Sequence, residues 1–193
     1  MSDSEPSPHI LHLGLAEQGK LHALAGRYEE ALRHYREAIR LAVSSKAPDV
    51  FFRHYTECVM EALEAQESYE PVIRFLEEAS AHYAGLSADA AIHKRDHAAM
   101  LARLGAVLLK AGRAEEARKR LEEAVDRAGP EAPPLAVELR GWLARGYAVD
   151  AGRVRESQRR HNAFVVRADR VEASLARPLP AREAASSPLP SGR

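Results

Sequence analysis

Residues 14–20 are the first stretch whose spacing could support chemistry, because two glycines and a lysine are placed there as in phosphate-binding loops. In such loops a Ser or Thr after the lysine holds magnesium, but the next residue here is Leu21. The stretch also lies inside a helical pattern with no strand before it, whereas phosphate binding needs a loop of free backbone N–H groups. The pattern therefore favours a helix containing two glycines over a nucleotide site.

Histidine pairs are the second candidate, because residues three or four apart on a helix can share a metal ion. His93 and His97 have this spacing, and His9 and His12 form a similar pair. No glutamate lies between His93 and His97 as in the zinc-protease pattern, and no cysteine pair supports either couple. No nucleophile, histidine and carboxylate can be grouped from their spacing. We therefore predict that the chain needs no metal or cofactor and is not an enzyme.

The composition excludes some classes of protein. The 28 basic and 28 acidic side chains cancel, and 46% of the residues are hydrophobic, which argues against a wholly basic nucleic-acid-binding protein and against a fully disordered chain. The single cysteine, Cys58, lies in an apolar helical stretch, which favours a buried side chain over a reactive thiol. Residues 1–10 lack a signal-peptide pattern, and no apolar run approaches the ~20 residues of a membrane span. We expect a cytoplasmic protein, and the excess of Arg and Ala indicates a bacterial source.

Apolar residues recur at helical spacing along most of the chain, and no strand pattern is present in the sequence. Gly26, Gly112 and Gly152 each follow such a pattern, and a glycine just past a helix end can satisfy the last carbonyls in the left-handed conformation. Short joints of this kind make successive helices pack antiparallel. The predicted fold class is all-α, with about eight helices at residues 9–24, 28–44, 48–66, 68–85, 88–111, 114–128, 134–150 and 153–175.

The two ends of the chain differ from this pattern. Residues 176–193 are rich in Pro, Ser and Ala and contain Pro-Leu-Pro twice. A segment of this composition cannot bury a core, so we predict a disordered tail, although Pro-Leu-Pro could also serve as a docking motif. With a disordered N-terminus at residues 1–8, residues 9–175 remain as one helical repeat domain.

An internal repeat relates three of the predicted helices. Residues 28–39, 69–79 and 114–125 share a pattern of acidic, small and large apolar side chains. The copies lie about 40 residues apart, more than the ~34 residues usual for helix-pair repeats. The chain resembles the tetratricopeptide repeat (TPR) family in its long-helix variety, and the clearest matching positions are Leu101, Leu104, Gly105, Leu108, Gly112, Ala117, Leu121 and Ala124.

The resemblance implies a solenoid of stacked helix pairs, in which the first helix of each pair lines a concave groove. Such a groove would bind a peptide or helix of a partner protein. Small side chains in it would leave room for a ligand, although they could also serve only to let helices approach. An amphipathic helix, an extended peptide or the chain's own tail could occupy it. The expected lining residues are Leu13, Ala16, Lys20, Ala99, Ala102, Ala106 and Leu109.

The charge is unevenly distributed although its sum is zero. Residues 1–100 carry 10 basic and 16 acidic side chains, and residues 101–193 carry 18 and 12. The opposite ends could attract one another in a head-to-tail homo-oligomer. A basic patch is predicted on the last helix at Arg153, Arg155, Arg159, Arg160, Arg167 and Arg170. It could meet an acidic partner or nucleic acid, but we favour a solvated capping helix, because a terminal repeat needs a polar outer face. Nucleic acid is the less favoured partner, because no aromatic side chains interleave with the arginines to stack on bases.

We therefore predict a non-enzymatic adaptor or scaffold for protein–protein interaction. The first alternative is a secretion or assembly chaperone that shields a hydrophobic client in the same groove. The second is a nucleic-acid-associated regulator that acts through the Arg-rich last helix, and the third is a self-assembling structural solenoid. All four functions share the predicted fold, so only the partner distinguishes them.

Overall fold

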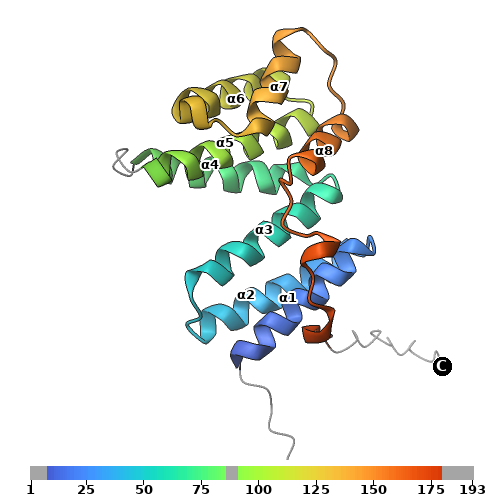
Figure 1. Cartoon of the computed structure of the whole chain (residues 1–193). Helices are drawn as coiled ribbons and strands as arrows, with labels where there is room; N and C mark the ends of the chain where they lie inside the picture. Colours follow the sequence, from blue (N-terminus) through green and yellow to red (C-terminus); the bar gives the residue numbers. More distant parts are fainter. Residues whose placement is uncertain (1–7, 86–90, 180–193) are drawn as a thin grey trace, which may run out of the picture.

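The computed structural model describes residues 8–85 and 91–179, and within these ranges the chain is helical and has no strand. The prediction of an all-α repeat of about eight helices is confirmed. Figure 1 shows the helices following one another as neighbours along the chain. Their bounds are α1 (Pro8–Leu24), α2 (Tyr28–Ser44), α3 (Asp49–Ala65), α4 (Tyr69–Gly85), α5 (Ala91–Lys110), α6 (Ala114–Ala128), α7 (Pro134–Ala144) and α8 (Ala151–Arg160), with a 3-10 turn η1 (Gly129–Glu131) before α7.

Glycine turns join α1 to α2 and α5 to α6. Gly26 and Gly112 take φ values of 74° and 77°, the left-handed conformation that the sequence predicts for them. The third predicted joint is wrong, because Gly152 lies inside α8. The Asp150 side chain caps that helix two residues earlier, and the positive φ after α7 belongs instead to Gly146, at 70°.

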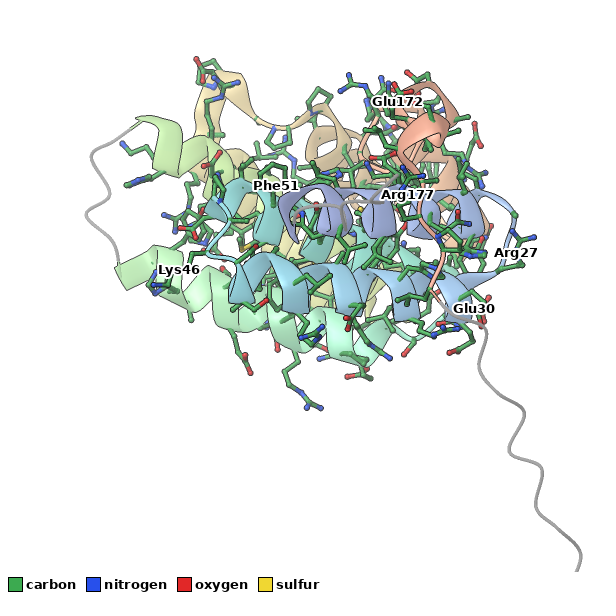
Figure 2. The ribbon with its side chains drawn as sticks, turned by 90° about the horizontal axis from the view of Figure 1, so that it is seen from below. Arg27, Glu30, Lys46, Phe51, Glu172 and Arg177 are labelled. Carbon is green, nitrogen blue, oxygen red and sulfur yellow. The ribbon has the colours of Figure 1, made fainter. Side chains whose placement is uncertain are left out.

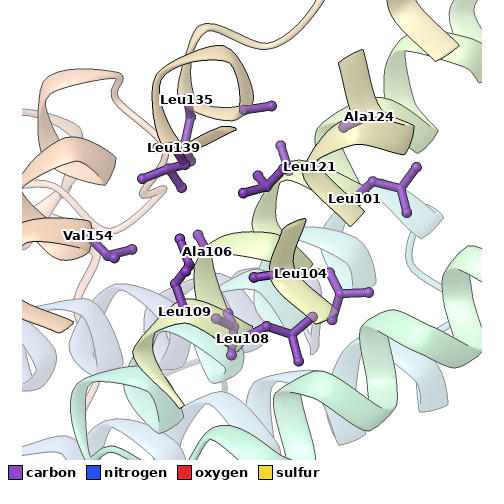
Figure 3. Close-up of a cluster of buried hydrophobic side chains, with 14 of the residues drawn as sticks. Leu101, Leu104, Ala106, Leu108, Leu109, Leu121, Ala124, Leu135, Leu139 and Val154 are labelled. Atoms are coloured by element: carbon purple, nitrogen blue, oxygen red, sulfur yellow. The ribbon is translucent and has the colours of Figure 1, made fainter. Parts of the chain in front are cut away.

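The apolar core is divided into one large and two small clusters. The large cluster draws residues from α3 to α8 and is centred on α5, where Leu101, Leu104 and Leu108 are fully buried. Figure 3 shows Leu104 and Leu108 of α5 and Leu121 of α6 within this cluster. The two small clusters lie among α1, α2 and α3. Because α3 contributes to all three clusters, it links one half of the molecule, formed by α1 and α2, to the other half, formed by α4 to α8.

Helices α3 and α4 diverge. They share far fewer contacts than the hairpins α1–α2 and α5–α6 do, and α3 packs mainly on α2 while α4 packs mainly on α5. Figure 1 shows α3 and α4 close together near the turn that joins them and well separated at their other ends. The second helix pair is therefore open, whereas the family resemblance implies a closely packed pair.

A buried polar network holds α3 against α5 and α8. The carboxylate of Glu64 on α3, only 2% exposed, accepts hydrogen bonds from Arg103 and Lys110 on α5. Lys110 also donates to Gln158 on α8 at 2.9 Å. Burial alone would raise the pKa of Glu64, but the two cations hold it below its ordinary value. Because a buried charge is costly without its partners, this network fixes the position of α3.

The last helix, predicted at residues 153–175, is shorter in the structure. α8 ends at Arg160 and not near residue 175. Asn162 then takes a φ of 50° and turns the chain away from the helix axis. Residues 161–179 form an extended segment, here called the C-terminal strap, which includes two short 3-10 turns, η2 (Ala168–Arg170) and η3 (Ala173–Leu175).

The C-terminal strap crosses from one half of the molecule to the other. Figure 1 shows it leaving α8, passing α3 and reaching α1. Residues 176–179, which the sequence assigns to a disordered tail, belong to this ordered strap. The remainder of that predicted tail and residues 1–7 lie outside the described residues.

Candidate protein-binding hollow

A hollow of about 660 Å³ opens between α3 on one side and α4 and α5 on the other. The start of α7 and the end of α8 contribute to its edge. Its volume is within the range of sites that bind ligands. We call it the α3–α5 hollow. Its apolar lining includes Val50, Phe52, Met60, Phe75, Leu76, Ala79, Tyr83, Ala99, Met100, Ala102 and Leu135.

Three large apolar side chains at the hollow are unusually exposed. Val50 and Phe52 on α3 are 55% and 45% exposed, and Phe75 on α4 is 41% exposed. They come from two different helices and line one cavity. Clustered apolar exposure of this kind, unlike single exposed residues, is typical of a surface that binds a partner. Met60 and Met100 add flexible thioethers that can adapt to the shape of a ligand.

The buried arginine of the hollow is neutralised within the chain. Arg103 donates to Glu57 across the hollow and to Glu64 behind it. Burial opposes the charge of Arg103, but these two carboxylates raise the pKa of its guanidinium above the ordinary value. Burial and the nearby Lys20 lower the pKa of His54, which favours a neutral imidazole. The hollow therefore offers a ligand mainly apolar surface.

Helix α5 places the predicted groove residues in two different environments. Ala99 is exposed at the α3–α5 hollow, and Ala102 also lines the hollow although it is only 3% exposed and belongs to the large core cluster. Ala106 and Leu109 are buried in the large core cluster, at 0% and 3% exposure. Figure 3 shows these two side chains within the large cluster, which also contains Val154 of α8. Since α7 and α8 cover this half of α5, Ala106 and Leu109 have no surface to offer a ligand.

The predicted groove residues on α1 do not line the hollow. Ala16 is 1% exposed and packs in one of the small clusters, and Leu13 is half-buried. Lys20 is 6% exposed and donates to Glu17 at 2.7 Å. Glu17 in turn accepts the backbone N–H of Glu172, in the strap, at 2.8 Å. This part of α1 is therefore in contact with the chain's own C-terminal strap.

The exposed apolar side chains of α3 and α4 were not among the residues predicted from the sequence. The predicted groove residues lie on the first helix of each pair, whereas Phe75 lies on a second helix. Phe75 reaches the hollow because α4 diverges from α3. No pattern in the nearby sequence predicts this divergence. Val50 and Phe52 could have been found, because they lie outside the buried stripe of α3 that contains Tyr55 and Cys58.

The six arginines of the predicted basic patch are divided between two elements. Arg153, Arg155, Arg159 and Arg160 lie on α8, while Arg167 and Arg170 lie in the strap. Arg153 stacks over the Trp142 ring at 4.6 Å. Several of the others have acidic partners: Arg159 with Glu156, Arg160 with Glu138 and Arg167 with Asp169. These arginines therefore do not form the single helix face that the sequence predicts.

One histidine of each candidate pair has a protein partner. His12 contacts the Tyr55 hydroxyl at 2.7 Å, and buried His97 contacts the Ser80 hydroxyl at 2.8 Å. Exposed His93 lies on α5. Residues 14–20 are part of α1, as predicted from their helical pattern.

One cluster of potential metal ligands is present among the described residues, formed by His22, Glu30 and His34. Its ligand atoms are already engaged. Arg27 donates to Nδ1 of His22 at 3.0 Å, and the Glu30 carboxylate is paired with Arg33. Nδ1 of His34 donates to a backbone carbonyl, and its Nε2 accepts a backbone N–H from the strap. A metal ion at this position would therefore have to displace these hydrogen-bond and ion-pair partners.

Comparison with known proteins identifies a repeat. Residues 19–44 and 97–128 match the model of the tetratricopeptide repeat. The first stretch covers the end of α1 and all of α2, the second covers most of α5 and all of α6, and each includes one of the two glycine turns. No curated protein and no solved structure matches the chain.

The repeats of this family are generally protein–protein interaction modules, and the family is typically non-enzymatic. Among the described residues, none of the helices has the length and apolar character required to cross a membrane. The bacterial origin and cytoplasmic location stay predictions.

Proposed function

Because the chain belongs to the tetratricopeptide repeat family, we propose that it is a non-enzymatic adaptor that binds an apolar segment of a partner protein in the α3–α5 hollow. One observation carries the proposal: Val50, Phe52 and Phe75 remain exposed although they are large and apolar, and they meet at one cavity. Burial of apolar area against a partner would stabilise the complex by about 25 cal/mol per Å² before the costs of association.

An amphipathic helix is the partner segment that suits the hollow best. Two helices that diverge from a common turn leave a wedge into which a third helix can pack its apolar side chains. The hollow is lined by residues from successive turns of α3, from Val50 to Met60. Anchors spaced three or four residues apart on a partner helix would follow this line. Arg103 is already paired with Glu57, so the charge that the hollow offers a partner comes from exposed Arg53 and Asp96.

The proposal is tested by capture of a partner with variants of the full-length chain. Phe75→Asp places a charge in the hollow, and Val137→Asp is its matched control, since Val137 is 44% exposed on α7 and does not line the hollow. Each bait is incubated with nuclease-treated lysate of the source organism. We expect the wild type and Val137→Asp to enrich the same protein, and Phe75→Asp to lose at least ~90% of it.

Circular dichroism before the capture would establish that all baits are folded. Equal enrichment by Phe75→Asp and Val137→Asp would contradict the proposal. A client held in fixed stoichiometry and released unfolded would indicate the chaperone alternative. Ala99→Arg offers an independent test, because Ala99 is exposed at the hollow and a long charged side chain there should block the same ligand.

A further inference from the structure

The C-terminal strap is held on α1, α2 and α3 chiefly by its own backbone. Five of its N–H groups donate to acceptors on these helices. The acceptors are the Glu61 carboxylate (from Val165 and Val166 at 2.5 and 2.9 Å), the Glu17 carboxylate (from Glu172 at 2.8 Å), the Gly14 carbonyl (from Arg177 at 2.9 Å) and Nε2 of His34 (from Leu179 at 3.0 Å). Backbone N–H groups are present in almost any peptide, so this mode of binding depends little on sequence.

Glu61 is the centre of this arrangement. Each of its two carboxylate oxygens accepts one N–H from adjacent residues of the strap, and the side chain is only 8% exposed. A carboxylate at such a depth needs hydrogen-bond donors. Because Glu61 lies on a helix that is fixed by the buried network around Glu64, the acceptor is already in place for any extended segment that supplies two adjacent N–H groups.

Apolar contacts at two points add side-chain selectivity. Val165 and Val166 are partly buried against the small cluster that contains Tyr35, Cys58 and Ala62. At the other end of the strap, Leu179 packs on the small cluster that contains Tyr55. The site therefore accepts an adjacent pair of aliphatic side chains and, more than ten residues later, a single one.

Gly14 shapes the middle of the site. A Cβ atom at this position would lie 2.5 Å from Cγ of Arg177 and 2.8 Å from the carbonyl oxygen of Leu175. Figure 2 shows Arg177 lying over α1. The helix therefore presents a flat backbone surface, against which an extended chain can approach closely.

The strap is bound only at the surface. None of residues 161–179 is fully buried, and Leu175 is 47% exposed. Apart from its two 3-10 turns the segment has no regular structure of its own. Segments with so few buried contacts open at low free-energy cost. The strap can therefore leave its site without unfolding of the helices beneath it.

We propose that the surface formed by Gly14, Glu17, His34 and Glu61 is a second recognition site, which takes an extended partner segment with two adjacent aliphatic residues, and that the C-terminal strap is its built-in competitor. The strap is the template for this partner class, because it shows which groups the surface binds. None of these four residues lines the α3–α5 hollow, so the inference does not depend on the proposed function of the hollow. The docked strap lowers the apparent affinity for a partner to the intrinsic affinity multiplied by the fraction of chains in which the site is open.

A labelled peptide with the sequence of residues 163–179 tests this inference on the full-length chain by fluorescence anisotropy. The double variant Val165→Asp with Val166→Asp weakens the strap in cis but leaves the site intact. We expect it to bind the peptide at least ~10-fold more tightly than the wild type does, because the competitor has left. A peptide with the same two aspartates should bind neither protein. A peptide that keeps only Val165, Val166 and Leu179, with alanine elsewhere, should bind within ~3-fold of the natural sequence.

Further variants in the background of the double variant locate the site. Gly14→Ala and Glu61→Ala should each weaken peptide binding at least ~10-fold. Gly141→Ala should not, because a Cβ there would make only an ordinary van der Waals contact, at 3.7 Å from the end of the Arg145 side chain. Phe75→Asp should also leave peptide binding unchanged, which separates this site from the hollow. Equal peptide binding by the wild type and the folded double variant would overturn the inference, and so would binding that ignores Gly14→Ala. A wild-type dimer formed by exchange of straps would assign the site to self-assembly and would also overturn it.

Discussion

Arg103 of α5 donates from Nε and Nη2 to a single oxygen, Oε1, of Glu64 on α3, at 3.0 and 2.7 Å. The two side chains are 12% and 2% exposed, so the pair lies almost entirely away from water. It joins helices on opposite sides of the α3–α5 hollow, and Arg103 itself lines that hollow. The width of the hollow therefore depends on a buried ion pair as well as on apolar packing.

Arg103→Ala should destabilise the chain strongly, because Glu64 would keep a buried charge with one of its cations removed. We expect a loss of about 3 kcal/mol in the free energy of unfolding, measured by urea denaturation. Arg40→Ala is the matched control, since Arg40 pairs with Glu37 on the solvent side of α2 and is 63% exposed. That change should have little effect. Comparable losses in the two variants would show that the buried pair does not fix α3.

The protonation of Glu61 should make stability depend on pH. Burial raises the pKa of Glu61 to about 7, against the opposing effects of Arg103 and of the N–H groups of Val165 and Val166. The ordinary value of 4.5 applies to the unfolded chain. Between these two pH values the folded chain binds the proton more tightly, so the contribution of Glu61 to stability falls as the pH rises from about 4.5 to about 7. The whole shift corresponds to on the order of 3 kcal/mol.

Urea unfolding of the wild type and of Glu61→Gln at pH 5 and pH 8 isolates this contribution. Glutamine does not titrate, so all other groups cancel in the difference between the two proteins. The wild type should lose stability relative to Glu61→Gln on going from pH 5 to pH 8. A difference that stays constant, or that changes in the other direction, would be inconsistent with a buried carboxyl of raised pKa.

Gly14→Ala should loosen the strap while favouring helix α1. Alanine in a helix interior is about 1 kcal/mol better than glycine, but its Cβ would collide with the backbone of Leu175. Hydrogen exchange read by mass spectrometry should show faster exchange in residues 165–179 and unchanged exchange in α1. Gly141→Ala should raise stability without altering exchange in the strap. Unchanged strap exchange in Gly14→Ala would refute the close approach.

Cys58 should report on the strap as well as on folding. Burial raises the pKa of its thiol to about 12, and the side chain is fully buried. The native thiol should therefore react with a disulfide reagent far more slowly than a free thiol does. Because Val165 and Val166 pack on the cluster that contains Cys58, replacing both with Asp should accelerate the reaction by several-fold. An unchanged rate in that variant would mean that the strap does not cover this cluster.

The parts of the fold that depend on nearby residues were the ones that could be predicted. Leu101, Leu104 and Leu108 recur at helical spacing before Gly112, and they are buried in the hairpin α5–α6 as expected. The angle between α3 and α4 depends on bonds from Glu64 to residues 39 and 46 positions away. Pairing between residues so far apart leaves no periodic pattern in the sequence, so the contribution of α4 to the hollow could not be predicted.

The strap escaped prediction for a similar reason. The spacing of Val154, His161, Phe164, Ala168 and Val171 fits a helix, but only Val154 lies in α8. Beyond Arg160 the backbone N–H groups find acceptors on α1 to α3, the nearest of them about 100 residues earlier in the sequence. Local propensity cannot anticipate such acceptors.

Photo-crosslinking from inside the hollow tests the central claim most directly. Benzoylphenylalanine is introduced in place of Phe52, which lines the hollow, and in a second protein in place of Val137, which is similarly exposed but lies outside it. After irradiation in lysate of the source organism, the account predicts one discrete adduct with a single protein from position 52 and none from position 137. The same adducts from both positions, or none from position 52 while the chain still captures its partner, would contradict the assignment of the hollow as the binding site.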